Sequence, residues 1–391
     1  MLGLYCNWKV TPSGNGFYIN AIHAKYLMMF NKKYGSLILM SNVTERSNNI
    51  NSSDVYIEID NNIKLIALPY FSSYIGAIRH FPKILKAMWV FFCECQLIYV
   101  RSPEPLSWLL GLFNFKKAKT INYHFTSNPL QVLLSSHSSN FLVKYLKVII
   151  FFPEYLLICL AAKFNKCSAN GESILPYLPF FIKKKDVIVH IESTLTKDEL
   201  DIDLCMDKHI FWDELETLNL ICVSRLQQGK GIDILLKAIV NLKSNNPGLK
   251  FILNIVGDGP LYNHYESMIL TLGISDCVKL HGHVKNGPDL DKIYLESHVL
   301  INPSLSETGP RVLLEAMRLS VLCISTDVGY AKRLIKSGEE NGIIIRPNSV
   351  DEIEKSIVWV SDNKCDAWIM ASHSYEKSKL YSLDYFIDSI F

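Results

Sequence analysis

A short loop between a predicted strand and a predicted helix carries two positive charges that could bind an anion. The apolar run Leu218 to Val223 predicts a buried strand, and apolar residues at helical spacing begin near Gly231. Arg225 and Lys230 lie in the loop between them. Free backbone N–H groups and the dipole at a helix N-terminus favour an anion, and arginine can bind two phosphate oxygens at once. The loop is therefore a candidate diphosphate site, although cations are also common beside surface turns.

Two carboxylates follow a later strand at a spacing that would let both face one ligand. Glu307 lies in a strand-to-helix loop, Pro310 can begin the following helix, and Glu315 lies about one turn inside it. Carboxylates accept hydrogen bonds from sugar hydroxyls, such as the paired hydroxyls of a ribose. The same spacing fits a simple helix-surface pair between Glu315 and Arg311, four residues earlier. On these residues alone both interpretations stay open.

Repeated strand–helix units surround both segments in the second half of the chain. The predicted strands there are Leu218 to Val223, Phe251 to Val256, Val278 to Leu280, Val299 to Ile301, Leu322 to Ser325 and Ile343 to Ile345. Helices are expected to begin near Gly231, after Pro260, and near Asp289, Arg311, Ala331 and Val350. Continuously apolar strands that alternate with helices predict a parallel sheet covered on both faces.

The first half repeats this pattern less regularly. Its predicted strands are Leu2 to Cys6, Ser36 to Met40, Ile63 to Leu68, Leu97 to Val100 and Thr120 to Tyr123. Its predicted helices are Phe17 to Asn31, Ile75 to Cys93 and the region Leu142 to Ala162. A chain of 391 residues is too long for one ordinary core. We therefore predict a domain at 1–195, a polar linker at 196–216, a second domain at 217–375, and a C-terminal helix at 376–391 that returns to the first domain.

Composition limits the class of protein. The net charge is only +2, and no arginine-rich stripe or basic tail is present, so nothing indicates a nucleic-acid partner. The ten cysteines show no paired spacing typical of metal ligands and indicate a reducing compartment. The first strand begins near Met1, without the pattern of a secretory signal, so we expect a cytoplasmic protein.

Two apolar stretches bear on membrane contact. Lys147 to Ala162 is strongly apolar, but Pro153 and Glu154 interrupt it and it is shorter than the ~20 residues that span a bilayer. We therefore expect a buried helix there. Phe81 to Phe92 mixes lysines with aromatic residues, which suits either peripheral contact with the inner face of a membrane or a half-buried helix with exposed lysines.

Several motifs together resemble the retaining glycosyltransferases of family 4, which have the GT-B fold. The resemblance covers Leu218 to Ile357 closely and the first half only loosely. It implies an α/β chain with two Rossmann-like doubly wound domains facing an interdomain cleft. The motifs are Arg225-x4-Lys230-Gly231, Val256 to Leu261, Val278 to Val284, two glutamates (Glu307 and Glu315) with seven residues between them and then Ala316-Met317, Asn341-Gly342, and Pro347.

The resemblance also implies an activity: transfer of a sugar from a nucleotide diphosphate sugar to a glycan or lipid-linked acceptor, with retention and without a metal ion or other cofactor. Arg225 and Lys230 would bind the donor diphosphate, Glu307 would face the transferred sugar, and Glu315 would hold the ribose. His124, at a predicted strand end, resembles a family histidine near the donor sugar, although a structural histidine fits as well. Further donor contacts are implied for Gly14, Gly16, Gly257, Gly282, His283, Val284, Thr308, Gly309, Pro310, Arg311 and Val312.

The chain departs from the family pattern at three places, one of which is Arg318-Leu319-Ser320 in place of a common Ala-Cys-Gly turn. Asn15 separates two glycines that the family has as a pair, and Thr308-Gly309-Pro310 stands where members often have Gly-Phe-Gly. Two rival functions stay open: another GT-B enzyme, such as a nucleotide-sugar epimerase or a phosphorylase, or a catalytically silent scaffold of a polysaccharide-assembly complex. The resemblance, with many lysines, asparagines and isoleucines, suggests bacterial surface polysaccharide synthesis, such as that of lipopolysaccharide O-antigen, capsule or exopolysaccharide.

Overall fold

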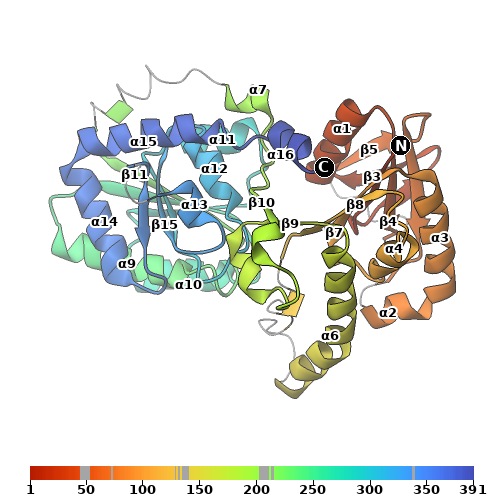
Figure 1. The fold of residues 1–391 in the computed structure, drawn as a ribbon. Helices are drawn as coiled ribbons and strands as arrows, with labels where there is room; N and C mark the ends of the chain where they lie inside the picture. The colour runs from red at the N-terminus through yellow and green to blue at the C-terminus, as the bar shows by residue number, and fades with distance from the viewer. Residues whose placement is uncertain are drawn as a thin grey trace. The chain divides into compact units, whose positions relative to one another are not determined.

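The chain folds into two compact units, each with its own parallel sheet between helices (Figure 1). The computed structural model describes residues 1–44, 53–71, 74–127, 129–130, 133, 141–201, 211–212, 215–336 and 340–391. Unit 1 comprises Met1–His190 and Leu383–Phe391, and unit 2 comprises Ile191–Ser382. Each unit is described by itself below.

Unit 1 contains a parallel sheet in the strand order β10-β9-β8-β7-β1-β4-β6. Its strands are β1 (Leu2–Tyr5), β4 (Leu37–Asn42), β6 (Ile63–Leu68), β7 (Leu97–Ser102), β8 (Thr120–Phe125), β9 (Lys166–Asn170) and β10 (Ile188–His190). Later strands add to β1 on both sides, so the strand order reverses between β1 and β7. The carboxyl ends of parallel strands at such a reversal are where α/β folds place ligands.

Helices and a small second sheet complete unit 1. The helices are α1 (Ala21–Tyr34), α2 (Tyr74–Arg79), α3 (Phe81–Glu94), α4 (Trp108–Phe113), α6 (Phe141–Lys163) and α16 (Leu383–Ser389), with 3-10 turns η1 (Glu172–Tyr177) and η2 (Lys184–Asp186). The small antiparallel sheet consists of β2 (Thr11–Ser13), β3 (Gly16–Asn20) and β5 (Asp54–Glu58). The C-terminal helix α16 packs on α1, where Phe386 meets the ring of Tyr26 edge-on.

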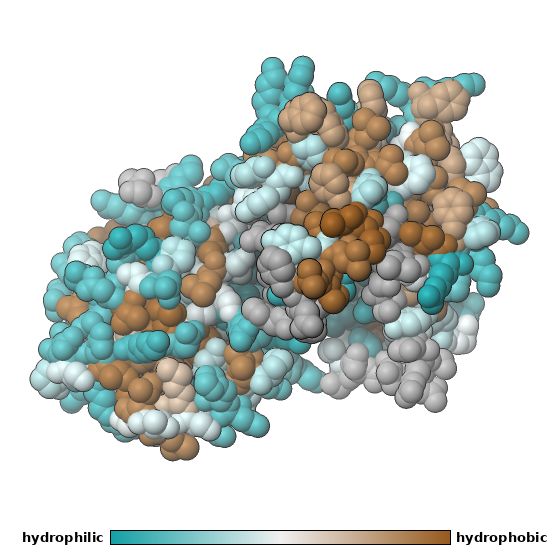
Figure 2. All heavy atoms as spheres, turned by 90° about the horizontal axis from the view of Figure 1, so that it is seen from below, coloured by the Kyte–Doolittle hydropathy of each residue, from teal (hydrophilic) through white to brown (hydrophobic). Residues whose placement is uncertain are grey.

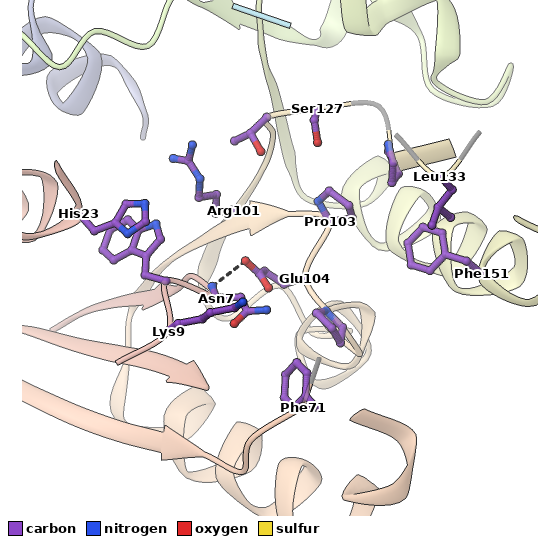
Figure 3. A pocket seen from close by; sticks show the side chains of 14 residues that line it. Asn7, Lys9, His23, Phe71, Arg101, Pro103, Glu104, Ser127, Leu133 and Phe151 are labelled. Carbon is purple, nitrogen blue, oxygen red and sulfur yellow. Dashed lines mark hydrogen bonds between the residues drawn. The ribbon is translucent and has the colours of Figure 1, made fainter. Parts of the chain in front are cut away.

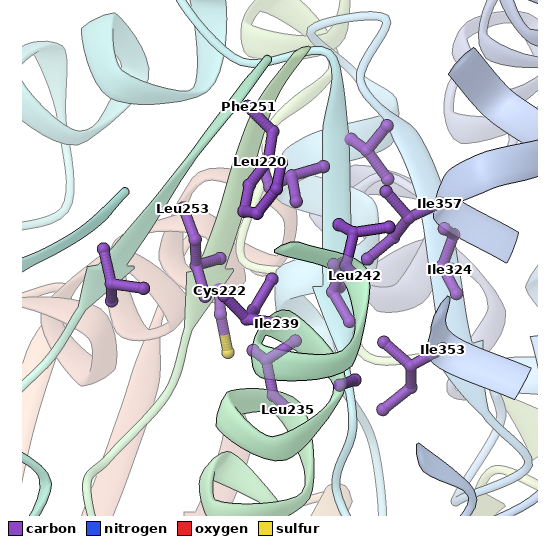
Figure 4. Close-up of a cluster of buried hydrophobic side chains, with 14 of the residues drawn as sticks. Leu220, Cys222, Leu235, Ile239, Leu242, Phe251, Leu253, Ile324, Ile353 and Ile357 are labelled. Carbon is purple, nitrogen blue, oxygen red and sulfur yellow. The ribbon is translucent and has the colours of Figure 1, made fainter. Parts of the chain in front are cut away.

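Unit 2 contains a parallel sheet in the order β13-β12-β11-β14-β15-β16. Its strands are β11 (Leu218–Val223), β12 (Phe251–Val256), β13 (Val278–Gly282), β14 (Val299–Asn302), β15 (Leu322–Thr326) and β16 (Ile343–Ile345). Its helices are α7 (Lys197–Leu200), α9 (Ile232–Asn245), α10 (Tyr262–Thr271), α11 (Pro288–Leu295), α12 (Arg311–Met317), α13 (Ala331–Leu334), α14 (Val350–Asp362) and α15 (Lys364–Ser378). Figure 4 shows aliphatic side chains of β11, β12, α9 and α14 packed together against one face of the sheet.

The unit boundaries correct three predicted domain limits. Unit 1 ends at His190, not at residue 195, because Ile191 and Leu195 are buried in the core of unit 2. Part of the predicted linker, 196–216, also packs there through Leu200 and Trp212, while 202–210 and 213–214 lie outside the described residues. The predicted returning segment, 376–391, begins too early, since only Leu383–Phe391 belongs to unit 1.

The predicted helix at Phe17 to Asn31 is wrong at its start. Residues Gly16–Asn20 form β3, and α1 begins only at Ala21 after Asn20 caps it by accepting a hydrogen bond from Ile22 N. The glycine-rich segment is therefore a β-hairpin. A side chain at Gly16 would lie 2.3 Å from the carbonyl oxygen of Ile57, so this glycine is required by strand pairing.

Helix α6 is not the buried helix that the apolar composition predicts. It is 23 residues long and contains Pro153. Residues such as Leu142, Leu146 and Ile149 in its first half are exposed, whereas Tyr155, Ile158 and Cys159 in its second half are buried. Helix α3, the lysine and aromatic stretch, is a half-buried helix that buries Ile84, Met88, Phe91 and Phe92.

Candidate functional site

The two charged segments of unit 2 meet at the carboxyl edge of its sheet. Strands β11 and β14 are neighbours, and the strand order reverses between them, because β12 and β13 lie on one side and β15 and β16 on the other. The loops after the two strands are in contact, since Leu305 N donates to Gly229 O at 2.8 Å. Gly231, with φ of 68°, has no room for a side chain, which would lie 2.1 Å from Pro303 O. The fold thus brings together residues more than 70 positions apart in sequence.

Lys230 and Glu307 form an ion pair across these loops. Lys230 Nζ donates to Glu307 Oε1 at 2.5 Å, and Ser304 Oγ donates to the same oxygen at 2.9 Å. The side chains of the lysine and the glutamate are only 18% and 16% exposed. A pair so shielded from water interacts more strongly than an ion pair on an open surface. Lys230 is therefore held at the sheet edge by a specific acidic partner.

Arg225 lies directly after β11 and is exposed. Its loop is fixed to the loop after β12, because Leu226 N donates to Asp258 O at 2.9 Å. Gly257, with φ of 142°, has no room for a side chain, which would lie 1.9 Å from Ser224 O. Close packing of two loops therefore requires the glycine at 257, for which we predicted donor contact. Arg225 itself makes no hydrogen bond or ion pair with the described residues.

Glu315 is positioned by a buried tyrosine. It lies on α12 and accepts a hydrogen bond of 3.2 Å from the hydroxyl of Tyr294 on α11. Burial raises the pKa of the Glu315 carboxyl, which the charge of Arg311 partly opposes. The helix-surface pair with Arg311 is thus replaced by a hydrogen bond from Tyr294, and Arg311 acts on Glu315 only at longer range. The glutamate pair of the sequence motif is anchored separately: Glu307 to Lys230, and Glu315 to Tyr294.

The turn from Thr308 to Val312 leads from the Glu307 loop into α12. It packs on Gly329, where a side chain would lie 2.5 Å from Thr308 O. Pro310 precedes α12 as its N-cap residue and is buried, and Arg311 N donates to Gly309 O at 3.0 Å. Contacts to the backbone therefore hold the turn in place.

The segment predicted to frame the nucleotide base lies at the end of β13. Gly282 has φ of 70° and its carbonyl oxygen accepts a hydrogen bond of 2.8 Å from Gly257 N, so the segment adjoins the loop after β12. His283 is exposed and Val284 is half-buried. His281 bonds instead to Asn254 Oδ1 at 2.8 Å, and the two histidines share no partner. In the part of the chain that the structure describes, no group of three or more His, Cys, Asp or Glu side chains is placed to hold a metal ion.

The structure places His124 away from any surface and contradicts its predicted role. Its side chain is fully buried in unit 1, and Nδ1 lies 2.8 Å from Ser168 Oγ. Its ring packs against Tyr99 and the edge of Phe386 on α16. A side chain with no exposed surface cannot touch a donor sugar in this conformation. His124 therefore acts as a structural histidine that ties β8 to the C-terminal helix.

Unit 1 has a cavity of about 530 Å³ at the corresponding edge of its own sheet (Figure 3). Asn7 follows β1, and Arg101 and Glu104 lie at and after the end of β7, so the cavity sits where the strand order reverses. Glu104 Oε1 accepts a hydrogen bond of 2.7 Å from Asn7 N. Burial raises the pKa of Glu104 to about 8, although the hydrogen bond from Asn7 and the charge of Arg101 both oppose this shift.

The residues of this cavity were missed in the sequence. A signal was present, because polar residues directly follow two strands that the apolar pattern predicts. It could not be used without knowing that β1 and β7 are neighbours, which no local pattern reveals.

Comparisons with known proteins agree with this architecture. Residues 213–377 match the family model described as glycosyl transferases group 1. The phosphatidylinositol N-acetylglucosaminyltransferase gpi3 subunit of Schizosaccharomyces pombe is 32% identical over 120 residues, which is 31% of this chain and 26% of that protein. An uncharacterized glycosyltransferase of Methanocaldococcus jannaschii is 28% identical over 193 residues, which is 48% of this chain and 47% of that protein. The chain thus spans less than half the length of these relatives.

Solved structures extend the likeness to the whole chain. Anabaena HepE, crystallised with UDP, superposes with a TM-score of 0.68 at 16% identity, covering 99% of this chain and 96% of that one. At this identity the likeness concerns the fold alone. Residues 213–377 are thus similar to the glycosyl transferases group 1 family, and the chain has a two-domain, Rossmann-like GT-B fold.

Proposed function

We propose that this protein is a retaining glycosyltransferase that moves a sugar from a nucleotide diphosphate sugar to a glycan or lipid-linked acceptor. The observation that carries the proposal is the contact between the loops after β11 and β14, which joins Lys230 to Glu307 at the sheet edge. The similarity to the group 1 family supports it, as do the N-acetylglucosaminyltransferase relative and the UDP bound by HepE. We also propose a cytoplasmic location and a role in bacterial surface polysaccharide synthesis.

The proposed chemistry depends on charge that develops as the donor bond breaks. The diphosphate gains negative charge, which Arg225 and Lys230 would neutralise without a metal ion. Glu307 would face the transferred sugar, and Glu315, held by Tyr294, would accept hydrogen bonds from the ribose. The acceptor hydroxyl would attack the face that the diphosphate leaves and pass its proton to a phosphate oxygen. Fixed charges placed where charge develops are typically worth ~3 to 4 kcal/mol each in the transition state.

A panel of nucleoside diphosphates and their sugars, beginning with UDP, tests this function. A ligand at a hundred times its Kd stabilises the folded protein by ~2.7 kcal/mol, so the cognate donor should raise the unfolding midpoint by several degrees. Mass spectrometry of reactions with and without acceptor then separates the rivals. An epimerase changes the donor alone, and a phosphorylase requires inorganic phosphate. If no nucleotide shifts the midpoint, the proposal fails.

We further propose that the unit 1 cavity receives the acceptor. Its lining combines the polar residues Glu104 and Arg101 with apolar ones such as Trp8 and Phe71, which suits a sugar, because a sugar has both hydroxyl groups and apolar faces. With its raised pKa, the Glu104 carboxyl is mostly protonated at pH 7 and can both donate and accept a hydrogen bond. That pattern matches a sugar hydroxyl.

The titration of Glu104 predicts a specific dependence of stability on pH. Its folded pKa of about 8 lies above the ordinary value of 4.5, so the folded state binds more protons between these values. The contribution of this group is therefore full below pH 4.5 and is lost as the pH rises through 8. We expect the free energy of unfolding of the wild type to fall across this range relative to Glu104→Gln, by on the order of 1.4 kcal/mol per pKa unit, and the unfolding midpoint to fall with it.

Differential scanning calorimetry from pH 4.5 to 9 measures this difference. The exposed Glu58→Gln is the matched control in the same unit and should leave the pH profile of the wild type unchanged. If the unfolding midpoints of wild type and Glu104→Gln change with pH in parallel, the pKa of the Glu104 carboxyl is not raised and the prediction is wrong.

A further inference from the structure

An apolar surface on unit 1 centres on helix α6. Its segment Leu142–Lys163 contains an 18-residue window with a mean hydropathy of 1.8, and only 28% of that window is buried. Leu142 is 80% exposed and Ile149 is 66% exposed. Figure 2 looks from below, the direction in which α6 projects in Figure 1, and shows hydrophobic residues gathered there. Exposed apolar side chains in such number are typical of a surface that contacts a membrane or another protein.

The second half of α6 is anchored to unit 1. Glu154 is buried and accepts hydrogen bonds from Leu106 N at 2.5 Å and Trp108 Nε1 at 2.8 Å. The stretch up to Pro153 is mostly exposed, although Phe151 packs against the domain core. At 1.5 Å per residue its 13 residues extend about 20 Å, which is short of the ~30 Å hydrocarbon core of a bilayer. This helix can enter a membrane interface without spanning it.

Helix α4 extends the apolar surface beside the anchored half. A groove of about 370 Å³ lies between α4 and α6, and most of its lining is apolar. We define the α6 surface as the exposed apolar residues of α6, of α4 and of the segments that follow them: Leu112, Phe115, Leu142, Val143, Leu146, Ile149, Ile150, Phe152, Leu157, Leu160 and Phe164.

The charges around the α6 surface are positive. From 141 to 166 the chain contains four lysines, Lys144, Lys147, Lys163 and Lys166, and a single acidic residue, Glu154, which is buried. Two lysines, Lys116 and Lys117, adjoin Phe115 at the groove. Lysines interspersed with exposed aromatic and aliphatic residues suit the headgroup region of an anionic bilayer, where each cation gains electrostatic attraction.

We propose that the α6 surface docks this protein on an anionic lipid bilayer. A second copy of the chain would cover the same apolar residues but would bring two sets of lysines together, which like-charge repulsion opposes. Membrane docking itself does not depend on the proposed glycosyl transfer. The use of docking to reach a lipid-linked acceptor rests on that proposed function. Phe151 of α6 lines the unit 1 cavity (Figure 3), so docking would bring that cavity beside the headgroups, where a lipid-linked acceptor presents its sugar.

Vesicle co-sedimentation of the full-length chain tests the proposal. Vesicles of neutral phosphatidylcholine are compared with vesicles that contain about a third phosphatidylglycerol. We expect binding to the anionic vesicles, a loss of at least tenfold in Leu146→Ser/Ile149→Ser, and a loss of roughly fivefold for each of Lys144→Gln and Lys163→Gln. Leu270→Ser in unit 2 is the matched control, since Leu270 is 68% exposed and lies outside the α6 surface.

Three results would overturn the docking proposal. One is a chain that stays in solution with anionic vesicles, and another is a Leu146→Ser/Ile149→Ser variant that sediments like the wild type. The third is a soluble dimer that this variant converts to monomers, which would assign the surface to a second copy. The thermal response of the double variant to nucleotides is measured in parallel. Unchanged nucleotide binding with lost sedimentation separates the membrane role from the proposed activity.

Discussion

Lys230→Ala should lower the turnover number more than a hundredfold while leaving the fold intact. The side chain lies where the two loops of unit 2 meet, and its charge would oppose the negative charge that develops on the leaving diphosphate. Removal of one such group typically costs ~3 to 4 kcal/mol in the transition state. Steady-state kinetics with the donor identified by thermal shift give the turnover number, and circular dichroism reports the fold.

The loss of Lys230 also leaves Glu307 without its cation, so a structural effect has to be separated from a catalytic one. The double variant Lys230→Ala/Glu307→Gln removes both charges and should recover stability without recovering turnover. Lys237→Ala, on the exposed side of α9, removes an equal charge from the helix that Gly231 caps. This variant should change neither the turnover number nor the stability. Retained turnover in Lys230→Ala would place the active site elsewhere in the chain.

The sheet of unit 2 could be predicted from the sequence because most of its strands are short, mainly apolar segments; β13, with Lys279 and His281, is the exception. Strands β11 and β12 match the predicted bounds fully, and those of β14 and β15 match to within one residue. Buried parallel strands tolerate few polar residues, so this pattern is strong and local. The contact between Lys230 and Glu307 depends on β11 and β14 being neighbours, which the residues of these strands do not indicate.

Unit 1 was less predictable because its features depend on distant partners. A strand residue alternates between two faces, so its position at a strand end does not tell whether it faces a ligand or a packed helix. The helix that covers His124 is α16, more than 250 residues further along the chain. Gly16 similarly fits a phosphate loop or a strand, and its partner on β5, Glu58, decides.

Helix α6 shows a different limit. Its apolar residues occur on all sides of its first half, and the composition of such a helix is the same whether protein or lipid surrounds it. Burial by a domain core requires enough neighbouring elements, and the sequence does not show that the helix extends beyond them. The expectation of a buried helix failed for this reason.

Glu307→Gln should bind nucleoside diphosphate more tightly and turn over more slowly. Without ligand, the positive charge of Lys230 is compensated by Glu307, so the phosphates have to compete with a carboxylate at 2.5 Å. Glutamine keeps the shape and can still accept from Ser304, but it no longer competes as an anion. We expect a Kd for UDP about tenfold lower, which is ~1.4 kcal/mol and exceeds the 0.2–1 kcal/mol of an exposed pair because both side chains are shielded. Turnover should fall at least tenfold, because the carboxylate that would face the sugar is absent.

Isothermal titration calorimetry with UDP and single-turnover kinetics measure the two effects. Glu296→Gln removes the carboxylate of an exposed pair with Lys292 in the same unit and should change neither quantity. Weaker UDP binding by Glu307→Gln would mean that the glutamate aligns Lys230 with the phosphates and does not compete with them.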